Sequence, residues 1–327
     1  MLNIFSKFIF FICFIVQSAF AQLVPINETE LSNMTGQAFI NIDQSSANGL
    51  DFTKITLGLD VKTLLNSDLL ELGKYERSGE DSGSADIRIS DFALGEIDSN
   101  GNIIPFEVKD PFIELAFEEE NGKENLVGVR LGFGGASGKL SGDIQYLTGN
   151  INVNIAGTAK PIRDVAGGFN RFLLSLAGIS DSTQLSASAE LVNQSTGVSD
   201  PIRAQYVGIK NGDVLNCNDG CGLGGLSNAL LSLFSSNQCA VLGIDTCFPL
   251  SAYKSLDIGS GNADASGLFL SFQTKSLTWY DNGQGTQTVE GAFFNIPNGG
   301  ITVNFEEAFQ GTARARTRYA DPYFGGF

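Results

Sequence analysis

The sequence contains six Asn-Gly dipeptides, and they constrain its fold more than any other feature. Both central residues of a type I′ turn need positive φ, so Asn-Gly between alternating apolar and polar runs is a strong β-hairpin signal. The dipeptides stand at residues 48–49, 100–101, 121–122, 211–212, 282–283 and 298–299. Alternating runs flank three of them, in residues 87–92, 103–108, 112–117, 126–133, 268–279 and 286–294. The sequence therefore predicts a mainly β fold, either an antiparallel sandwich or an extended twisted-sheet stack.

Helical periodicity is limited to a few short segments. Apolar residues recur near helical spacing in Val61–Leu72 and Ile162–Ala177, and a Gly follows each segment. Leu223–Phe234 is a third candidate helix. The polar positions of these segments lack the Lys and Arg enrichment of membrane-surface helices. We therefore expect the helices to cover an open end of the sheet core.

Residues 1–21 have the pattern of a cleavable secretory signal peptide. Lys7 gives a positive start, residues 8–16 form a short apolar core, and residues 19–21 read Ala-Phe-Ala, a small-residue cleavage site. This core is too short to span a bilayer comfortably, which favours cleavage over an uncleaved anchor, and no transmembrane segment is expected in the mature chain. We expect export through the inner membrane, followed by folding of residues 22–327 as a single large β domain.

The cysteines that follow the signal are clustered. An even number of clustered cysteines in an exported chain indicates disulfides, here two bonds with three possible connectivities. A metal site with four thiolates is the alternative, but the spacing lacks the paired two-residue knuckles of zinc ribbons. We predict two disulfide bonds and a disulfide-stapled insertion at residues 212–250, without redox chemistry because no C-x-x-C is present. The cysteines are Cys217, Cys221, Cys239 and Cys247.

Composition excludes several classes of protein. The chain has no histidine, and 36 acidic residues outnumber 20 basic ones. The absence of histidine excludes Ser-His-Asp and Cys-His catalysis and imidazole ligation of zinc or haem. An acidic chain without a basic run is also a poor partner for nucleic acid.

Carboxylates are the remaining candidates for catalysis, as the acid pair of a glycan hydrolase. Glu114, Glu118, Glu119 and Glu120 lie on one predicted strand and its turn. The last three stand beside Asn121-Gly122, a position typical of a solvated hairpin tip. We predict that the protein is not an enzyme, with no catalytic residue and no cofactor.

Two loops carry oxygen side chains at spacings that suggest calcium. Residues 98–102 read Asp-Ser-Asn-Gly-Asn, but Gly is fourth, and Lys109 stands where an EF-hand needs a bidentate Glu. Asp257–Asp264 is an equally incomplete loop. We predict a hairpin turn at residues 98–102 and assign no metal ligand at either place.

Three arginines alternate near the end of the sequence, at Arg314, Arg316 and Arg318. On a strand, this spacing places all three side chains on one face. Such a strand is either an edge protected by charge or a surface that docks on an acidic face of a neighbouring subunit. We name the three arginines as a candidate assembly interface for head-to-tail association.

One segment resembles a known family. Residues 30–43 read ELSNMTGQAFINID, which resembles the ELSxxTGQAxIxI signature of exported gammaproteobacterial proteins described as surface-layer or filament (fimbrial) proteins. Residues 110–117, 127–133 and 316–325 are similar to other parts of that family. The resemblance implies a place in the envelope of a Gram-negative bacterium and brings no catalytic residues. The signature residues in this chain are Glu30, Leu31, Ser32, Thr35, Gly36 and Gln37.

These observations predict a secreted, non-enzymatic structural or adhesive protein at the cell surface or cell outer membrane, such as a filament (fimbrium) or surface-layer subunit. Its partners would be further copies of itself or other envelope proteins, and the periplasm is the alternative compartment. A binding protein for a lipid or other apolar ligand is the second hypothesis, and a large apolar internal cavity would favour it. A carboxylate-based glycan hydrolase is the third, and two convergent carboxylates in an open cleft would favour that.

Overall fold

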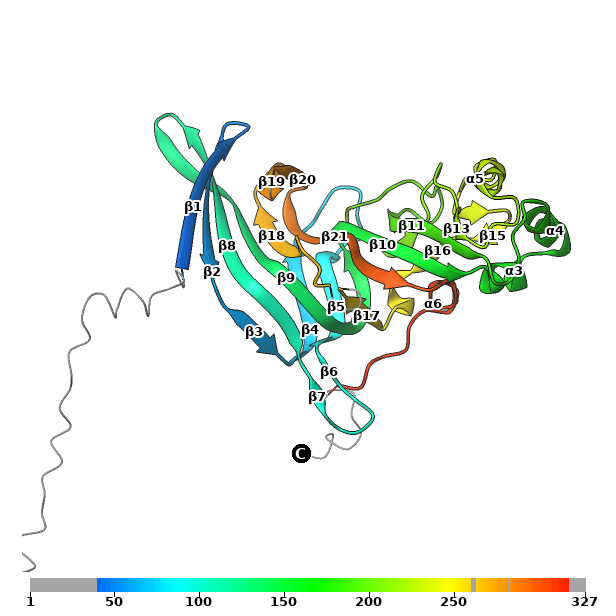
Figure 1. The fold of residues 1–327 in the computed structure, drawn as a ribbon. Helices are drawn as coiled ribbons and strands as arrows, with labels where there is room; N and C mark the ends of the chain where they lie inside the picture. The colour runs from blue at the N-terminus through cyan, green and yellow to red at the C-terminus, as the bar shows by residue number, and fades with distance from the viewer. Residues whose placement is uncertain (1–39, 260–262, 282, 318–327) are drawn as a thin grey trace, which may run out of the picture. The chain divides into compact units, whose positions relative to one another are not determined.

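The computed structural model describes residues 40–259, 263–281 and 283–317, which all belong to one compact unit, Phe39–Phe327. The described chain is mainly β, as predicted, with four α-helices (Figure 1). Several sequence predictions fall outside the described residues: the signal peptide at 1–21, the signature residues Glu30, Leu31, Ser32, Thr35, Gly36 and Gln37, and Arg318.

Most strands in the described residues join one branched sheet. Its strands are β1 (Ile40–Ala47), β2 (Leu50–Leu57), β3 (Asp60–Thr63), β4 (Leu65–Lys74), β5 (Ala85–Leu94), β8 (Phe106–Glu120), β9 (Lys123–Leu147), β10 (Gly149–Thr158), β11 (Gln184–Val192), β12 (Tyr206–Gly208), β13 (Asn216–Asp219), β16 (Cys247–Pro249), β17 (Ser255–Ile258), β18 (Phe269–Gln273) and β21 (Gly291–Val303).

Three two-stranded ribbons and the helices complete the described fold. The ribbons are β6 (Glu96–Ile97) with β7 (Ile103–Ile104), β14 (Ala240–Val241) with β15 (Ile244–Asp245), and β19 (Leu277–Asp281) with β20 (Gln284–Thr288). The helices are α3 (Lys160–Val165), α4 (Gly168–Leu176), α5 (Gly225–Leu231) and α6 (Phe305–Gln310), with a 3₁₀ turn η1 at Leu250–Ala252.

Strand β9 is the centre of the sheet. Along one edge it pairs first with β8 and then with β5, and along the other edge with β18 and β17. The path continues through β21, β10, β11 and β12 to β16, so β1 and β16 stand at opposite ends of the strand order. Pairing in the described sheet is antiparallel except between β10 and β21, which run parallel.

The Asn-Gly turns explain why the N-terminal strands pair as they do. Asn48 and Gly49 have φ of 54° and 77° between β1 and β2, and Asn121 and Gly122 have φ of 55° and 74° between β8 and β9. These are the positive values that a type I′ turn requires. The hairpin signal at 298–299 was wrong. That dipeptide lies inside β21, where the register against β10 shifts and absorbs the extra residues.

The helix predictions had mixed outcomes. Val61–Leu72 is not a helix but strands β3 and β4, because cross-strand partners on β8 and β5 decide the conformation of this short apolar segment. Ile162–Ala177 does form helices, as α3 and α4 with a break at residues 166–167, and Leu223–Phe234 contains α5.

The disulfide prediction is confirmed, and the structure supplies the connectivity. Cys217 is bonded to Cys221, and Cys239 is bonded to Cys247. Each bond joins cysteines that are close in sequence, four and eight residues apart. Both bonds therefore brace local segments of the 212–250 region and do not connect it to distant parts of the chain.

Candidate functional site

An apolar row, exposed on β1, β8 and β9 and partly buried on β2 and β18, crosses five strands of the sheet. The pairing register aligns Ile42 on β1 with Ile55 on β2, Ile113 on β8, Leu131 on β9 and Leu270 on β18. Ile42 is 62% exposed and Ile113 is 46% exposed. Positions two residues along each strand point to the same face and extend the row. The apolar sheet face consists of Ile40, Ile42, Ile55, Ile113, Leu115, Leu126, Val129, Leu131, Leu270 and Phe272.

Carboxylates stand at one end of the apolar sheet face, where the hairpins turn. Asp51, Glu119 and Glu124 are exposed and share this face, since they continue the alternation of the paired strands. We call these three residues the acidic rim. Glu119 lies directly opposite Glu124, a like-charge pairing that is unfavourable in a sheet. Neither side chain forms an ion pair within the described part of the chain.

The opposite face of the same strands is closed by the β19–β20 ribbon around a buried arginine. Arg130 is fully buried, and its Nε donates to Glu114 Oε2 at 2.7 Å while its Nη1 donates to Asp281 Oδ2 at 2.6 Å. The guanidinium carbon lies 5.1 Å from the Phe269 ring centroid and 5.2 Å from that of Trp279. Arg130 thus joins the ribbon to the sheet through ion pairs within an aromatic enclosure.

Glu114 was a candidate general acid, and in the structure its carboxylate accepts hydrogen bonds from Arg130 in this cluster. Burial raises the pKa of the Glu114 carboxyl, although Arg130 and Lys54 act in the opposite direction. An open pocket of about 470 Å³ lies beside the cluster and is lined in part by Lys54, Phe112, Tyr280 and Asp281. Glu114 itself does not line this pocket, so it is not placed to protonate a ligand there.

A second buried arginine anchors a distant loop. Arg203 Nε and Arg77 Nη1 both donate to Asp86 Oδ1, at 3.0 and 3.1 Å, and Asp86 Oδ2 accepts from the Ala292 amide at 2.9 Å. Arg203 Nη2 also donates to the Tyr75 carbonyl at 2.9 Å. Asp86 is fully buried, so its charge is balanced entirely by these donors.

Three carboxylates line the open pocket beside Arg203. It measures about 470 Å³, and Glu80, Asp81 and Asp200 line it. Burial and then the nearby Asp200 raise the pKa of Glu80. Asp81 is held by its own turn, because its carbonyl accepts from the Ser84 amide and hydroxyl. Sequence reasoning did not select these carboxylates, since they come from loops far apart in the chain.

Two apolar cavities lie inside the main core. Each holds only about 20 Å³ of free volume, and the first is lined by residues such as Ile144, Val207 and Tyr253. Pockets for drug-sized ligands are usually ~300–1,000 Å³. A lipid therefore does not fit either cavity.

A second apolar surface lies on helices α4 and α5. Phe169 is 72% exposed, and Phe172 and Leu176 are each 60% exposed. The prediction that this segment covers the core is wrong for these positions, because α4 instead buries Leu174. The start of the α5 region is joined to the end of α4 by a hydrogen bond from the Gly222 amide to the Gly178 carbonyl. The helix patch consists of Val165, Phe169, Phe172, Leu176, Leu223, Leu226 and Leu233.

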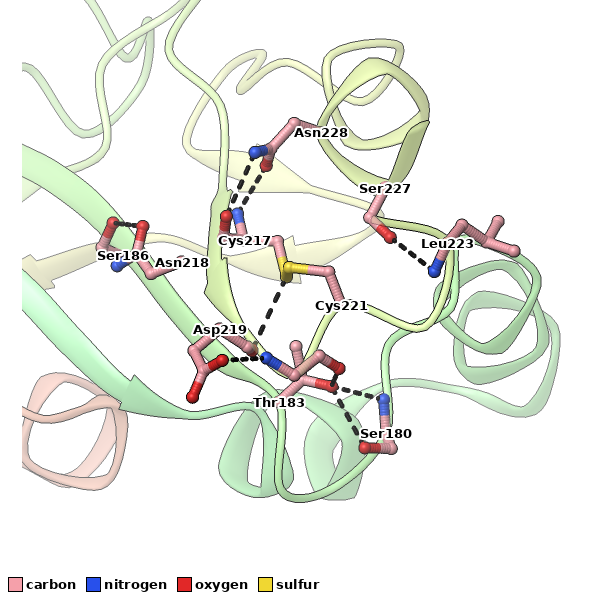
Figure 2. Close-up of a disulfide and its surroundings, with 11 residues drawn as sticks. Ser180, Thr183, Ser186, Cys217, Asn218, Asp219, Cys221, Leu223, Ser227 and Asn228 are labelled. Atoms are coloured by element: carbon pink, nitrogen blue, oxygen red, sulfur yellow. Dashed lines mark hydrogen bonds between the residues drawn. A yellow bond between two sulfur atoms is a disulfide. The ribbon is translucent and has the colours of Figure 1, made fainter. Parts of the chain in front are cut away.

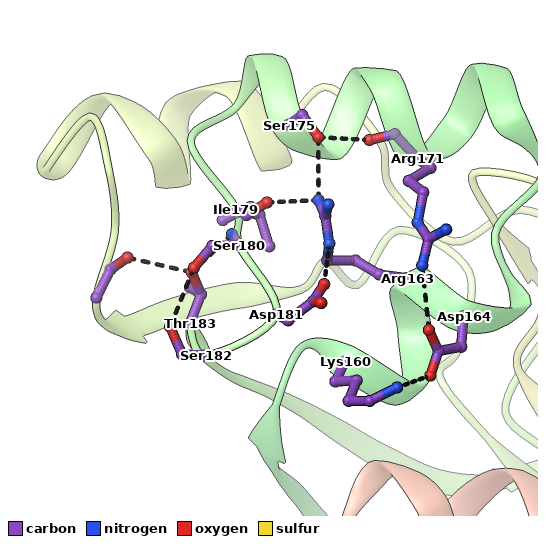
Figure 3. A network of polar contacts seen from close by, with 11 residues as sticks. Lys160, Arg163, Asp164, Arg171, Ser175, Ile179, Ser180, Asp181, Ser182 and Thr183 are labelled. Carbon is purple, nitrogen blue, oxygen red and sulfur yellow. Dashed lines mark hydrogen bonds and ion pairs between the residues drawn. The ribbon is translucent and has the colours of Figure 1, made fainter.

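A polar network explains why α4 turns its apolar stripe outward (Figure 3). Arg163 on α3 donates to Ser175 Oγ at 3.0 Å and to the Ile179 carbonyl at 2.6 Å, and it pairs with Asp181. Arg171 on α4 reaches Asp164 on α3 at 3.1 Å. These contacts turn the polar side of α4 toward α3. Because Leu174 faces the core, the Phe-rich stripe is left at the surface.

The first disulfide joins β13 to the loop before α5, and Asn228 of α5 bonds the backbone of β13 (Figure 2). The Cys217 amide donates to Asn228 Oδ1 at 2.6 Å, and Asn228 Nδ2 donates back to the Cys217 carbonyl at 3.1 Å. Thr183 Oγ1 donates to the Gly220 carbonyl at 3.1 Å, inside the disulfide loop. The leucines of α5 are therefore carried by a braced segment.

The described arginines near the end of the sequence do not lie on a strand, contrary to prediction. Residues 313–317 form no strand. Arg314 donates to the Asp91 carbonyl, and Arg316 donates to the Asp98 carbonyl at 3.3 Å. The Ile97 amide in turn donates to the Arg316 carbonyl at 2.7 Å. These contacts attach the segment to β5 and β6 of its own chain.

Of the remaining candidates, Asp98 lies in a turn, as expected, whereas Asp257 lies on β17 and Glu118–Glu120 lie at the end of β8. Asp98 accepts from the Asn100 and Asn102 amides, and the Asn102 hydrogen bonds lower the pKa of the Asp98 carboxyl. Asp257 and Asp264 pair with lysines. Glu118 pairs with Lys275, while Glu119 and Glu120 are exposed at the predicted hairpin tip.

No group of three or more Cys, Asp or Glu side chains in the described residues is arranged to hold a metal ion. None of the described helices has both the length and the apolar character needed to cross a bilayer. In comparisons with known proteins, the chain matches no family model, no curated protein and no solved structure.

Proposed function

We propose that this protein is a non-enzymatic structural protein of the bacterial cell surface that associates with copies of itself, as a filament or surface-layer subunit. The apolar sheet face carries the proposal. A contiguous apolar surface across five strands is costly to leave in water, and such surfaces commonly mark protein–protein contacts. The two disulfides are compatible with an oxidising compartment outside the cytoplasm.

A test of self-association uses one substitution at the centre of the apolar sheet face. Ile113→Asp adds a charge at a position that is already 46% exposed in the single copy. We expect this variant to remain folded but to need at least tenfold higher concentration to associate, because the charge must be desolvated at the contact. Sedimentation velocity of the mature protein across a concentration series measures the effect.

The matched control is Ile103→Asp in the β6–β7 ribbon. Ile103 is 62% exposed and lies outside the apolar sheet face. This variant should associate like the unaltered protein. If the unaltered protein stays monomeric at every accessible concentration, the proposed function is wrong.

Binding of a lipid or other apolar ligand is the second candidate, favoured by the same exposed side chains. Its site would be the open sheet face, since the internal cavities are too small. A fluorescent fatty acid that binds the monomer, with the Ile113→Asp variant weakened relative to Ile103→Asp, would support this candidate.

A further inference from the structure

We infer that the helix patch of one copy docks on the apolar sheet face of the next, so that the protein associates head to tail. This inference rests on the proposed function, because it names the two surfaces through which copies meet. It does not use the arginines at 314–318, whose described members contact their own chain.

The two surfaces lie toward opposite ends of the strand order. The apolar sheet face begins at β1, at one end of the strand order. Helix α5, which carries part of the helix patch, lies beside β13, and β13 pairs with β11 toward the other end of the strand order (Figure 1). A contact between two different surfaces of identical subunits is heterologous. It leaves one free surface of each kind on every dimer, so further copies can add.

The exposed apolar areas of the two surfaces are similar. With about 200 Å² for a large apolar side chain, the exposed fractions give the helix patch roughly 850 Å² of apolar area, and the six most exposed side chains of the sheet face give roughly 570 Å². Stable interfaces bury about 800 Å² on each partner. Each surface alone is therefore close to the size that one side of a specific interface needs.

The residues beside the helix patch carry an excess of positive charge. Lys160, Arg163 and Arg171 flank the helix patch and share two carboxylates, Asp164 and Asp181, which leaves one excess positive charge. Lys160 and Arg171 also remain substantially exposed.

The acidic rim has the opposite balance. Glu119 and Glu124 face each other without a cation, and a cation supplied by a second copy would relieve this repulsion. The helix patch of one copy is thus better matched to the sheet face of another than either surface is to itself.

The test mixes two variants that are each defective in one surface. Phe172→Asp disables the helix patch and leaves the sheet face intact, while Ile113→Asp does the reverse. Phe172 is 60% exposed and Ile113 is 46% exposed, so the fold should survive, and circular dichroism with thermal unfolding checks this. Alone, each variant should stay monomeric at concentrations where the unaltered protein forms larger species. Mixed in equal amounts, they should form a dimer and stop there, because only one intact pair of surfaces remains.

Sedimentation velocity distinguishes the outcomes. A 1:1 dimer from two monomeric variants supports the inference. Association of either variant alone at the unaltered level indicates a like-with-like contact through its intact surface and overturns the inference. Two monomeric variants that fail to combine also overturn it. In both cases the proposed self-association still stands. Only an unaltered protein that never associates removes the proposed function as well.

Discussion

Arg130 and Arg203 are both buried arginines that join segments far apart in sequence, yet they are satisfied in different ways. Arg130 binds mainly side chains, Glu114 and Asp281, within a wall of aromatic rings. Arg203 binds Asp86 but also backbone carbonyls that belong to β4 and the residue after it. A side-chain partner can be replaced by an apolar residue together with the arginine. A backbone partner stays in place after any substitution and is then left without its hydrogen bond.

The largest effect is expected from replacing the Arg203 pair by apolar residues. In Arg203→Met with Asp86→Leu, the carbonyls of Gly73 and Tyr75 and the Ala292 amide lose their partners. An orphaned buried group costs about 1–3 kcal/mol, and Arg77 also loses its ion pair with Asp86, so we expect a loss of about 4 kcal/mol or more. Urea denaturation measures it. A loss below about 1 kcal/mol would contradict the proposed difference between the two clusters.

A smaller effect is expected when the Arg130 pair is replaced. Arg130→Met alone leaves Glu114 buried without its cation, and we expect a loss of about 3 kcal/mol. Adding Glu114→Leu should recover most of that loss, because Asp281 keeps Lys54 and partial access to water. Urea denaturation of the single and double variants tests this. Failure of the second substitution to restore stability would show that the two clusters behave alike.

The smallest effect concerns pH. Because burial raises the folded-state pKa of Glu114 above its ordinary value of 4.5, its protonation favours the folded state. The stability of the unaltered protein relative to Glu114→Gln should therefore rise as pH falls through the folded-state pKa, and level off below 4.5. Urea midpoints of both proteins between pH 7 and pH 4 measure this difference. If the stability of the unaltered protein relative to Glu114→Gln falls on acidification, the Arg130 ion pair lowers the pKa of Glu114 more than burial raises it. The pKa values of Asp98, Asp164 and Asp264 are lowered from the ordinary value of 3.8. The stability that these three carboxylates contribute is therefore lost mainly below about pH 3.8, outside this pH range.

Local patterns predicted the mainly β fold, the turns at Asn48-Gly49 and Asn121-Gly122, and the disulfide bonding, because turn chemistry and clustered cysteines act over short distances. They failed for residues 61–72, where pairing with other strands overrides a helical spacing.

The buried arginine clusters gave no sequence signal. Arg130 and Asp281 are 151 residues apart, and Arg203 and Asp86 are 117 residues apart. The helix patch was also missed in part. The periodicity of α4 was found, but its orientation depends on Arg163, whose contacts with Ser175 and Ile179 arise only after folding.

The parallel pairing of β10 with β21 has a consequence for the order of folding. Strand β21 lies between β10 and the β17–β18 strands, so it connects the two halves of the sheet. Residues 149–158 cannot reach their parallel neighbour until residues 291–303 have been synthesised, and closing so long a loop is slow. A growing chain must therefore include β21 before the two halves of the sheet can be joined.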